Sequence, residues 1–347
     1  MGGMDIRGKR IGILAPVAWR TPPRAYGAWE TVASNVAEGL VARGWRNVTL
    51  FATGDSITRA RLVSFVDRGY EEDASQVPLV STCLHISRAL ERAGEFDLIH
   101  NHFDYLPLTY LPFVRTPMLT TIHGFSEPDI LRVYRSHKET YYVSISDSDR
   151  DAELPYVATV YNGIDLSNLT FRETPGEKLV HYGRIHPDKG THLAIEVARR
   201  SGRNLIIAGI VQDREYFDTQ VAPHVDGSSV RYIGPVDPPG RDALLAQAYA
   251  VIHLNTIPER FGLVMAESMA AGVPVIAMDL GSCREVVRDR QTGFLVRNVD
   301  EAVEAVGQIE RIDRRACRRR VEEHFTIDRM VAGYEKVYEE IFRRERR

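Results

Sequence analysis

Short apolar runs alternate with longer amphipathic segments along the whole chain. Most runs are almost continuously apolar, as in parallel strands that helices cover on both faces. Between the runs, apolar residues return every three or four positions, as in helices with one buried face. This alternation predicts an α/β protein with doubly wound sheets. The predicted helical faces are Trp29, Val32, Ala33, Val36 and Leu40, then Leu79, Cys83, Ile86 and Leu90; the predicted strands are RIGILAP, NVTLFAT, FDLIHNH, PMLTTIHG, TYYVSIS, VATVYNG, KLVHYGR, NLIIAGI, VRYIGPV, AVIHLNT, PVIAMDL and GFLV.

The alternating pattern occurs twice and is interrupted once. The segment LSNLTFRETPGEK, residues 166–178, is polar, contains a Pro-Gly pair and lacks periodicity, which is typical of a connection between domains. We therefore expect two Rossmann-like domains, residues 1–168 and 169–325, that face each other across a cleft. Residues 326–347 form a long helical pattern with no strand after it, and we expect this helix to pack back on the first domain.

Composition excludes several classes of protein. A length of 347 residues favours two domains, and a net charge of −3 gives no reason to expect a nucleic-acid partner. Cys83, Cys283 and Cys317 are too far apart for a disulfide framework or a zinc ribbon, which favours a reducing, cytoplasmic location. We find no signal-peptide core and no apolar run of the ~18 residues that a membrane span requires.

Several common motifs are absent. The first strand is not followed by G-x-G-x-x-G, and no P-loop sequence occurs, which argues against a nicotinamide dehydrogenase and a P-loop nucleotidase. A D-x-D lies in DSDRD, residues 147–151, but we expect it to begin a helix rather than hold a metal. His100 and His102 alternate on a predicted strand and could suggest a metal pair, yet no third ligand is evident. We expect no metal and no cofactor.

Two glutamates flank a helix start in PERFGLVMAESMAAG. The helix begins near Gly262, and its unpaired amide groups favour a phosphate or a sugar oxygen. Glu259 precedes the helix and can accept hydrogen bonds from vicinal hydroxyls, and Glu267 lies about a turn and a half inside it. The sugar and the ribose of a nucleotide-sugar are two such diols. The alternative is an acid at a helix N-terminus and an unrelated exposed glutamate.

Two cations follow the first strand of the second domain. HYGRIHPDKG places Arg184 and Lys189 at the carboxyl end of the sheet, where α/β proteins bind ligands. Arginine can form two parallel hydrogen bonds to a phosphate, and lysine adds a point charge. We interpret the pair as a site for the diphosphate of the nucleotide-sugar, the alternative being an ordinary solvated loop.

The chain resembles glycosyltransferase family 4, a retaining, metal-independent family with the GT-B fold. The resemblance covers nearly the whole chain, and its most specific part is the E-x7-E pattern together with Arg184 and Lys189. Other matching segments are NLIIAGI, VRYIGPVD and GSCREVVRDRQTGFLV in the second half, and YGAWETVASNVAEGLVARG, FDLIHNHFDY, TTIHG, VSISDSDR and YNGID in the first.

This resemblance implies roles for individual residues. Arg184 and Lys189 would bind the diphosphate, Glu259 the sugar hydroxyls and Glu267 the ribose hydroxyls. His123, in TTIHG, would face the donor sugar from the first domain and contribute to catalysis with Arg184, Lys189 and Glu259. The implied donor-binding set also contains Gly27, Arg260, Phe261, Gly262, Leu263 and Val264, and the implied acceptor-binding set contains Tyr26, Trp29, His102 and Asp104.

The sequence departs from the family pattern in three places. Tyr26-Gly27 replaces a pair of glycines, Asn255-Thr256 replaces Pro-Ser, and Ser268 replaces an alanine. None of these changes removes a charged position. They leave the donor sugar and the acceptor undecided.

The resemblance implies transfer of a hexose with retention, in which the acceptor hydroxyl approaches from the side that the nucleotide leaves. UDP-glucose is the first candidate donor and GDP-mannose the second, and the acceptor is a small molecule, a saccharide or a lipid. Alternatives are a sugar-nucleotide 2-epimerase, a phosphorylase, for which no pyridoxal phosphate motif is found, and a non-catalytic nucleotide-sugar-binding protein. Residues 58–68 and the FRRERR end could contact anionic lipid weakly; a covered strand and a solvated tail are the simpler interpretation.

Overall fold

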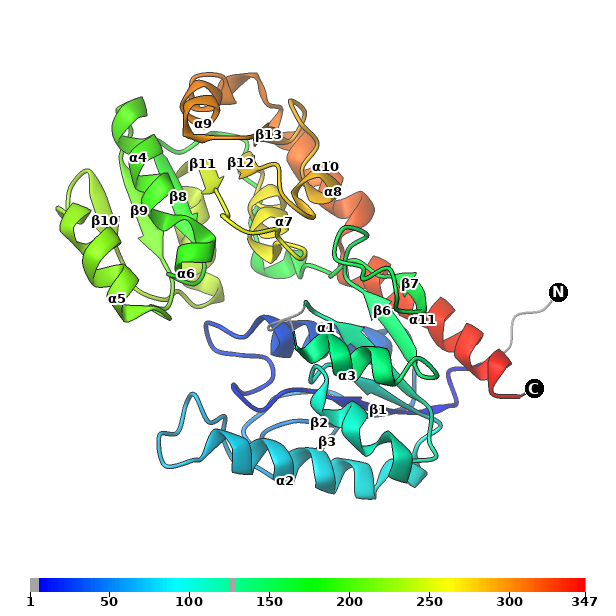
Figure 1. Ribbon diagram of the computed structural model, residues 1–347. Coiled ribbons are helices and arrows are strands. Elements are labelled where there is room, and N and C mark those ends of the chain that lie inside the picture. Colours follow the sequence, from blue (N-terminus) through cyan, green and yellow to red (C-terminus); the bar gives the residue numbers. More distant parts are fainter. Residues whose placement is uncertain (1–5, 125–128, 347) are drawn as a thin grey trace. The chain divides into compact units, whose positions relative to one another are not determined.

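The computed structural model describes residues 6–124 and 129–346 (Figure 1). The chain divides into two compact units. Unit 1 comprises residues 1–163 and 327–347, and unit 2 comprises residues 164–326. The first division lies between Gly163 and Ile164, earlier than the boundary predicted after residue 168.

Unit 1 contains a seven-stranded sheet in the order β3-β2-β1-β4-β5-β6-β7, and all of its strand pairs are parallel. Six strands coincide with predicted apolar runs. The exception is the short edge strand β3, which lies in the basic segment 58–68 and which periodicity could not distinguish from a loop. The strands are β1 (Arg10–Leu14), β2 (Asn47–Phe51), β3 (Arg61–Val63), β4 (Leu98–Asn101), β5 (Met118–Ile122), β6 (Tyr141–Ser144) and β7 (Tyr156–Thr159).

Helices bury both faces of this sheet, because successive strand residues point to opposite sides. Ile13 belongs to the core under α1 (Ala28–Ala42) and α11 (Ile327–Arg344), whereas its neighbour Leu14 belongs to the core under α2 (Pro78–Glu91) and α3 (Ile130–Ser136). The predicted return of the C-terminal helix to the first domain is confirmed, since α11 packs beside α1 within unit 1.

The helix α2 turns a different face to the core from the predicted one. Ile86 and Leu90 are buried as expected, but Leu79 is 67% exposed and Cys83 is exposed as well. Polar side chains replace them on the inner face, and His85 is fully buried with its Nε2 3.1 Å from a backbone carbonyl oxygen. Buried polar groups with partners are compatible with a core, so apolar spacing alone misassigned the first turns of this helix.

The expected helix start at residues 147–151 is also wrong. This segment forms bends and turns between β6 and β7, and Asp151 accepts a hydrogen bond from the amide of Glu153 at 3.0 Å. Pro155 follows closely and disfavours helical geometry in the residue before it, Leu154. The acidic side chains therefore stabilise turns rather than a helix.

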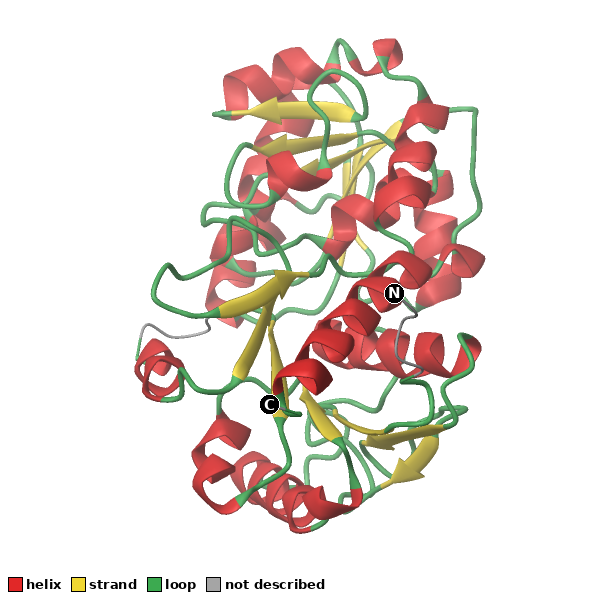
Figure 2. Ribbon diagram, turned by 90° about the vertical axis from the view of Figure 1, so that its right-hand side faces the viewer, coloured by secondary structure: helices red, strands yellow, loops and turns green. Residues whose placement is uncertain are grey.

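Unit 2 contains a six-stranded parallel sheet in the order β10-β9-β8-β11-β12-β13. Figure 2 shows the helices of both units lying around the strands. The strands are β8 (Lys178–Tyr182), β9 (Leu205–Ala208), β10 (Val230–Tyr232), β11 (Ala248–His253), β12 (Val275–Met278) and β13 (Gly293–Val296); the helices are α4 (Thr191–Ser201), α5 (Arg214–Tyr216), α6 (Pro238–Ala246), α7 (Leu263–Ala270), α8 (Cys283–Val286), α9 (Val299–Val306) and α10 (Arg314–His324).

Both sheets have a topological switch point. In unit 1 the chain runs from β1 outward to β2 and β3 and then returns to place β4 on the other side of β1. In unit 2 it runs from β8 to β9 and β10 and then places β11 beside β8. Ligands of such sheets bind at the carboxyl ends of the two strands that flank the switch point. These ends are where the predicted site residues lie.

Candidate functional site

In unit 2, the loops after β8 and β11 are held together at the level of the backbone. Gly190 has a left-handed φ of 64°, and a Cβ added to it would lie 2.0 Å from the carbonyl oxygen of Leu254. Only glycine permits this approach. Lys189, the preceding residue, is thereby fixed beside the end of β11. The conformation of this loop follows from its glycine rather than from its charges.

Glu259 lies at the centre of this site and is surrounded by donors. Its Oε2 is 2.8 Å from Lys189 Nζ and 2.9 Å from His253 Nε2, and it accepts a further hydrogen bond from Asn255. Its Oε1 accepts the amide of Arg260 at 3.0 Å. Burial alone would raise the pKa of Glu259, but the hydrogen bond from His253 and the charge of Lys189 outweigh it and hold the pKa well below its usual range. The carboxylate is therefore ionised and fixed in position.

Arg184 and Lys189 both extend from the loop after β8, and each already contacts an acidic side chain. Arg184 Nη2 lies 2.8 Å from Asp188 Oδ2, and its Nη1 donates to Gln212. The side chains of Arg184 and Lys189 are 24% and 20% exposed, respectively. Both cations are therefore accessible and pre-positioned, and an incoming anion would share them with Asp188 and Glu259. Sequence reasoning missed Asp188 and Gln212, which hold Arg184 in place.

Glu267 is on α7 and is not the exposed helix residue that the alternative interpretation required. It is 9% exposed, and its Oε1 lies 2.8 Å from Arg241 Nη1. Burial raises the pKa of Glu267, and the charge of Arg241 counteracts that shift. Tyr182, the last residue of β8, donates its hydroxyl to Glu267 at 3.4 Å. Arg241 and Tyr182 were not predicted, because neither stands in a motif that marks a ligand site.

The substitution of Ser268 for the family alanine has a local explanation. Its hydroxyl donates to the carbonyl of Val264 at 2.6 Å and lies 3.2 Å from the Tyr182 hydroxyl. The Tyr182 hydroxyl also lies 3.0 Å from the carbonyl oxygen of Val264, so Ser268 is its third polar partner, after Val264 and Glu267. Ser268 thereby supports the position of the Tyr182 ring beside Glu267.

The segment between the two glutamates combines a buried anchor with a glycine turn. The Phe261 side chain is 2% exposed and packs edge-to-face on Phe325, with ring centroids 5.7 Å apart. Gly262 then adopts a φ of 81° and precedes the first residue of α7, Leu263. Arg260, Leu263 and Val264 are partly exposed around this helix start. The first amides of a helix have no acceptor within it, so they are available to an oxygen of a ligand.

In unit 1, a tryptophan and three histidines lie at the carboxyl ends of β4 and β5. They are Trp29, His100, His102 and His123. His102 follows β4 and His123 follows β5, and Nδ1 of His102 lies 3.0 Å from Nε2 of His123. The Trp29 ring stacks on His123 at 5.6 Å between centroids. Burial lowers the pKa of His123 to about 3, so its ring is neutral near pH 7. A neutral ring can donate one hydrogen bond and accept another.

His102 was predicted to contact the acceptor, but its ring is fully buried. Burial also lowers its pKa well below the usual value. Its Nε2 makes no hydrogen bond to any of the residues that the structure describes, so the bond to His123 is its principal polar contact. His100, in turn, bonds Tyr338 of α11 at 2.7 Å and Thr121 at 2.8 Å. The structure therefore makes His102 a support for His123 rather than an exposed contact surface.

Asp104 and Tyr26, the other predicted acceptor residues, have partners within unit 1. Asp104 has a φ of 68°, unusual for a residue with a side chain, and its Oδ1 accepts the hydroxyl of Tyr134 at 2.5 Å. The Tyr26 ring meets Trp19 edge-to-face at 6.0 Å. Strained backbone of this kind is common at functional sites, but it does not identify an acceptor.

Gly27 immediately precedes α1 and has a φ of 144°, and Glu30, in the first turn of the helix, lies directly against it. A Cβ added to Gly27 would be 2.9 Å from Glu30 Oε2. Glu30 is 3% exposed and accepts the amide of Trp19 at 3.3 Å, and burial raises its pKa to about 7. Sequence reasoning missed Glu30. A detectable signal was its position three residues before Ala33, which places it on the buried face of α1.

Three similarities to known proteins agree with this geometry. Residues 169–324 match the model of the family described as glycosyl transferases group 1. Phosphatidyl-myo-inositol mannosyltransferase from Mycobacterium leprae is 24% identical over 323 residues, which cover 84% of either chain. Glycogen synthase from Mycobacterium tuberculosis is 26% identical over 336 residues, which cover 80% of either chain. The chain is a glycosyltransferase, and its residues 169–324 are those that match the group 1 family.

The fold of this glycosyltransferase agrees with solved structures. The Anabaena protein HepE, solved in complex with UDP and glucose, has a TM-score of 0.73 and 18% identity, and the match covers 95% of this chain and 99% of that one. The prediction of a GT-B fold with two Rossmann-like domains is confirmed, as is that of a glycosyltransferase.

Two further observations describe the glycosyltransferase as a whole. Over residues 6–124 and 129–346, no helix is both long and apolar enough to span a membrane. Within the same residues, no three histidine, cysteine, aspartate or glutamate side chains lie close enough together to hold a metal ion.

Proposed function

We propose that this enzyme is a retaining glycosyltransferase of family 4 that transfers a hexose from a nucleotide-diphosphate sugar to a hydroxyl group. UDP-glucose is the first candidate donor, and GDP-mannose is the second. The observation that carries the proposal is the arrangement at the β8–β11 switch point. There Lys189 contacts Glu259, Arg184 extends from the same loop as Lys189, and the buried Glu267 lies on α7. The relatives named for glycogen synthesis and mannosyl transfer support a sugar-nucleotide donor.

The donor diphosphate would take over the two cations. Its oxygens replace Asp188 as the partner of Arg184 and share Lys189 with Glu259. Charge that develops on the leaving diphosphate is then stabilised by groups already in place, which is the most effective form of electrostatic catalysis. The amides of Leu263 and Val264 at the start of α7 supplement them.

The two glutamates would bind the two diols of the donor. Glu259 is ionised and held by four donors, so it can accept hydroxyl groups of the sugar without reorientation. Glu267 would accept the ribose hydroxyls with the oxygen that Arg241 does not hold. Neither glutamate is a nucleophile in this scheme, because each is assigned to a different part of the donor.

His123 would orient the sugar through a hydrogen bond to one of its hydroxyls. Its neutral ring receives support from His102 on one nitrogen and from the face of Trp29. The acceptor hydroxyl then attacks the anomeric carbon on the face that the nucleotide leaves, and a phosphate oxygen of the donor takes the acceptor proton. The scheme requires no metal and no further cofactor. Tyr26, Trp29 and Asp104 remain the candidate acceptor contacts.

The test is a thermal-shift panel of UDP, GDP, ADP and their glucose, mannose and N-acetylglucosamine conjugates, with and without EDTA. A ligand that binds only the folded state raises its melting temperature. We expect stabilisation by one nucleotide series, unchanged by EDTA. No stabilisation by any of them, or stabilisation that EDTA abolishes, would contradict the proposal.

Turnover and variants complete this test. Incubation with the stabilising donor alone should give slow hydrolysis, whereas isomerisation would indicate an epimerase and binding without turnover a non-catalytic protein. We expect Lys189→Ala and Glu267→Ala to weaken nucleotide binding about tenfold or more. His123→Ala should mainly lower turnover. Arg199→Ala, an exposed cation in the last turn of α4, is the matched control and should behave like the wild type.

A further inference from the structure

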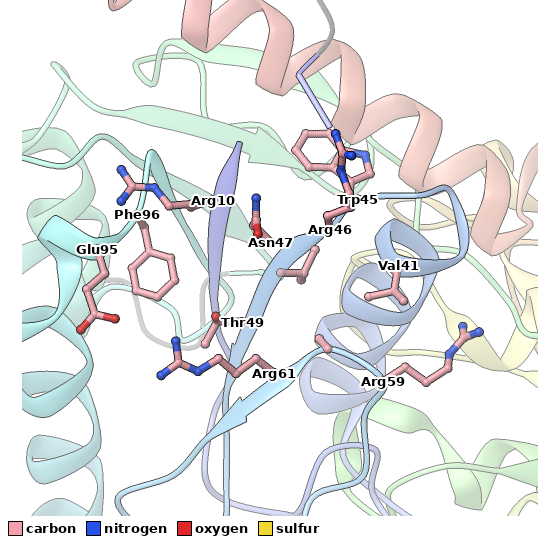
Figure 3. A pocket seen from close by; sticks show the side chains of 12 residues that line it. Arg10, Val41, Trp45, Arg46, Asn47, Thr49, Arg59, Arg61, Glu95 and Phe96 are labelled. Carbon is pink, nitrogen blue, oxygen red and sulfur yellow. The ribbon is translucent and has the colours of Figure 1, made fainter. Parts of the chain in front are cut away.

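A pocket lies in unit 1, at the edge of the sheet opposite His102 and His123. Figure 3 shows its lining residues. Its volume is about 290 Å³, at the small end of the range for ligand pockets. Arg10, Asn47 and Arg61 line it, and they are the first residues of β1, β2 and β3. The pocket is therefore at the amino ends of parallel strands, whereas the histidines follow the carboxyl ends. The proposed transfer reaction makes no use of it.

The strand register gathers polar groups on one face of this edge. Arg10 is paired with Asn47 on β2, and Arg61 is paired with Thr49 on the same strand. Asn47 and Thr49 are two residues apart, so all four side chains leave the sheet on the same side. Figure 3 shows Thr49 between Arg61 and Phe96.

The charge of the pocket is strongly positive. Four arginines line it, Arg10, Arg46, Arg59 and Arg61, against one carboxylate, Glu95. That carboxylate is already bonded by Arg92 outside the pocket, with both nitrogen–oxygen distances 2.8 Å.

Two of the four arginines form ion pairs with carboxylates that do not line the pocket, and the other two do not. Arg10 contacts Asp97 at 3.1 Å, and Arg59 contacts Glu38 at 2.7 Å. In the part of the chain that the structure describes, the guanidinium groups of Arg46 and Arg61 form no ion pair within 4.0 Å. The hydrogen bond and the charge of Arg92 and, at longer range, the charge of Arg61 lower the pKa of Glu95, so this one carboxylate is shared between them and the pocket keeps a net positive charge.

We propose that this pocket binds a phosphomonoester, such as a phosphorylated sugar. Guanidinium groups form paired hydrogen bonds to phosphate oxygens, and two of them can balance a dianion. The Thr49 hydroxyl and the Asn47 amide offer further hydrogen bonds, and the almost fully buried Trp45 and Phe96 complete the lining. The volume suits a monosaccharide phosphate better than a complete nucleotide-sugar. The site is separate from Arg184 and Lys189 and does not depend on the proposed function.

Isothermal titration with glucose 6-phosphate and with inorganic phosphate, at constant ionic strength, tests the proposal. We expect both to bind, and Arg46→Gln/Arg61→Gln to lose about tenfold or more in affinity. Both arginines are exposed, so the double variant should keep the wild-type melting temperature. Arg68→Gln removes an exposed arginine of the same region outside the pocket and should bind as the wild type does.

Two further experiments distinguish binding at this pocket from binding at the cations of unit 2 and identify whether the phosphate belongs to a lipid. Lys189→Ala removes a cation of unit 2 and should leave the affinity for glucose 6-phosphate unchanged. Phosphatidic acid also has a phosphomonoester headgroup, so binding to phosphatidylcholine vesicles with and without phosphatidic acid tests whether the ligand is a lipid. Vesicle binding that requires phosphatidic acid and that the double variant loses would assign the pocket to that headgroup. Absence of binding to every probe, or binding that the double variant retains, would overturn the proposal.

Discussion

At the scale of single residues, the candidate site regions of the two units differ in how their ionisable side chains are stabilised. In unit 2 the carboxylates are matched by cations, as in Glu259 with Lys189 and Glu267 with Arg241. In unit 1 burial lowers the pKa of His100 and of His123 to about 3, so both rings are neutral near pH 7, and it raises the pKa of Glu30 to about 7. The first arrangement suits a charged donor, and the second suits hydroxyl groups.

Glu30 should make the stability of unit 1 depend on pH. Its pKa is about 7 in the folded protein and near 4.5 in the unfolded chain, so the folded state retains the proton over the intervening range. Stability should therefore fall as pH rises from about 4.5 to about 7. Glu30→Gln should remove this fall and raise the melting temperature by several degrees at pH 8, with little change at pH 5. Thermal denaturation followed at both pH values provides the measurement; an equal effect at both would contradict the assignment.

His102 should act on catalysis only through His123. We expect His102→Ala to lower kcat about tenfold, with little change in the KM for the donor, because the ring that it supports loses its orientation. His102→Ala/His123→Ala should be no slower than His123→Ala alone, since residues that act as a unit are not additive. Steady-state kinetics of the three variants test this. His85→Ala, which removes another buried histidine of unit 1, controls for a purely structural loss.

Arg241 should be required for stability as well as binding. Removing one partner of a buried ion pair leaves an uncompensated charge, which costs about 3–5 kcal/mol. Arg241→Met should therefore destabilise the protein strongly, and the further change Glu267→Leu should restore much of the stability without restoring nucleotide binding. Denaturation and nucleotide titration of both variants separate the two effects. Full nucleotide affinity in the double variant would show that Glu267 is not part of the site.

At the scale of elements, the packing of α11 on α1 depends on one small residue. Gly39 lies under α11, and a Cβ there would come within 2.5 Å of Val331 Cγ2 and 2.9 Å of Ile327 Cγ2. Arg43, one turn later, fixes the same helix through a 2.7 Å ion pair with Glu335. The backbones of the two helices can therefore approach closely only because position 39 carries no side chain.

Gly39→Val should separate these helices. Overpacking of this kind costs about 1–3 kcal/mol, and we expect the melting temperature of the full chain to fall by several degrees. Gly94→Ala, at a site where an added Cβ meets nothing within 4 Å, is the matched control and should leave the melting temperature unchanged. Equal melting temperatures for both variants would show that α11 adjusts its position freely.

Elements were predicted correctly where strands are covered by helices on both faces. The predictions failed at an edge strand and at a helix with a partly polar inner face. Twelve of the thirteen strands in the described residues coincide with apolar runs, because parallel strands under helices need apolar side chains on both faces. β3 was missed since it is a short edge strand that begins with an exposed arginine. The first turns of α2 were misassigned because hydrogen bonding lets His85 occupy the core while Leu79 stays exposed.

At the scale of the whole molecule, the two-domain fold followed from the sequence, and so did the place of the candidate residues of unit 2 in that fold. Arg184, Lys189 and Glu259 lie at the carboxyl ends of β8 and β11, as strand order and loop motifs indicated. Their partners could not be predicted in the same way. Arg241 reaches Glu267 from α6, and Tyr338 reaches His100 from the far end of the chain, so only tertiary structure brings each pair together.

The point where the chain enters and leaves unit 2 has a practical consequence. The amide of Ile164 bonds the carbonyl of Phe325 at 2.7 Å, and Ile164 and Thr326 form a parallel bridge. The two ends of unit 2 are thus neighbours, as in a domain inserted into a host. A domain consisting of residues 164–326 would therefore have adjacent termini. After its removal from the chain, Gly163 could be joined to Ile327 by a short linker. Unit 2, with its proposed nucleotide site, could then be exchanged between enzymes independently of unit 1.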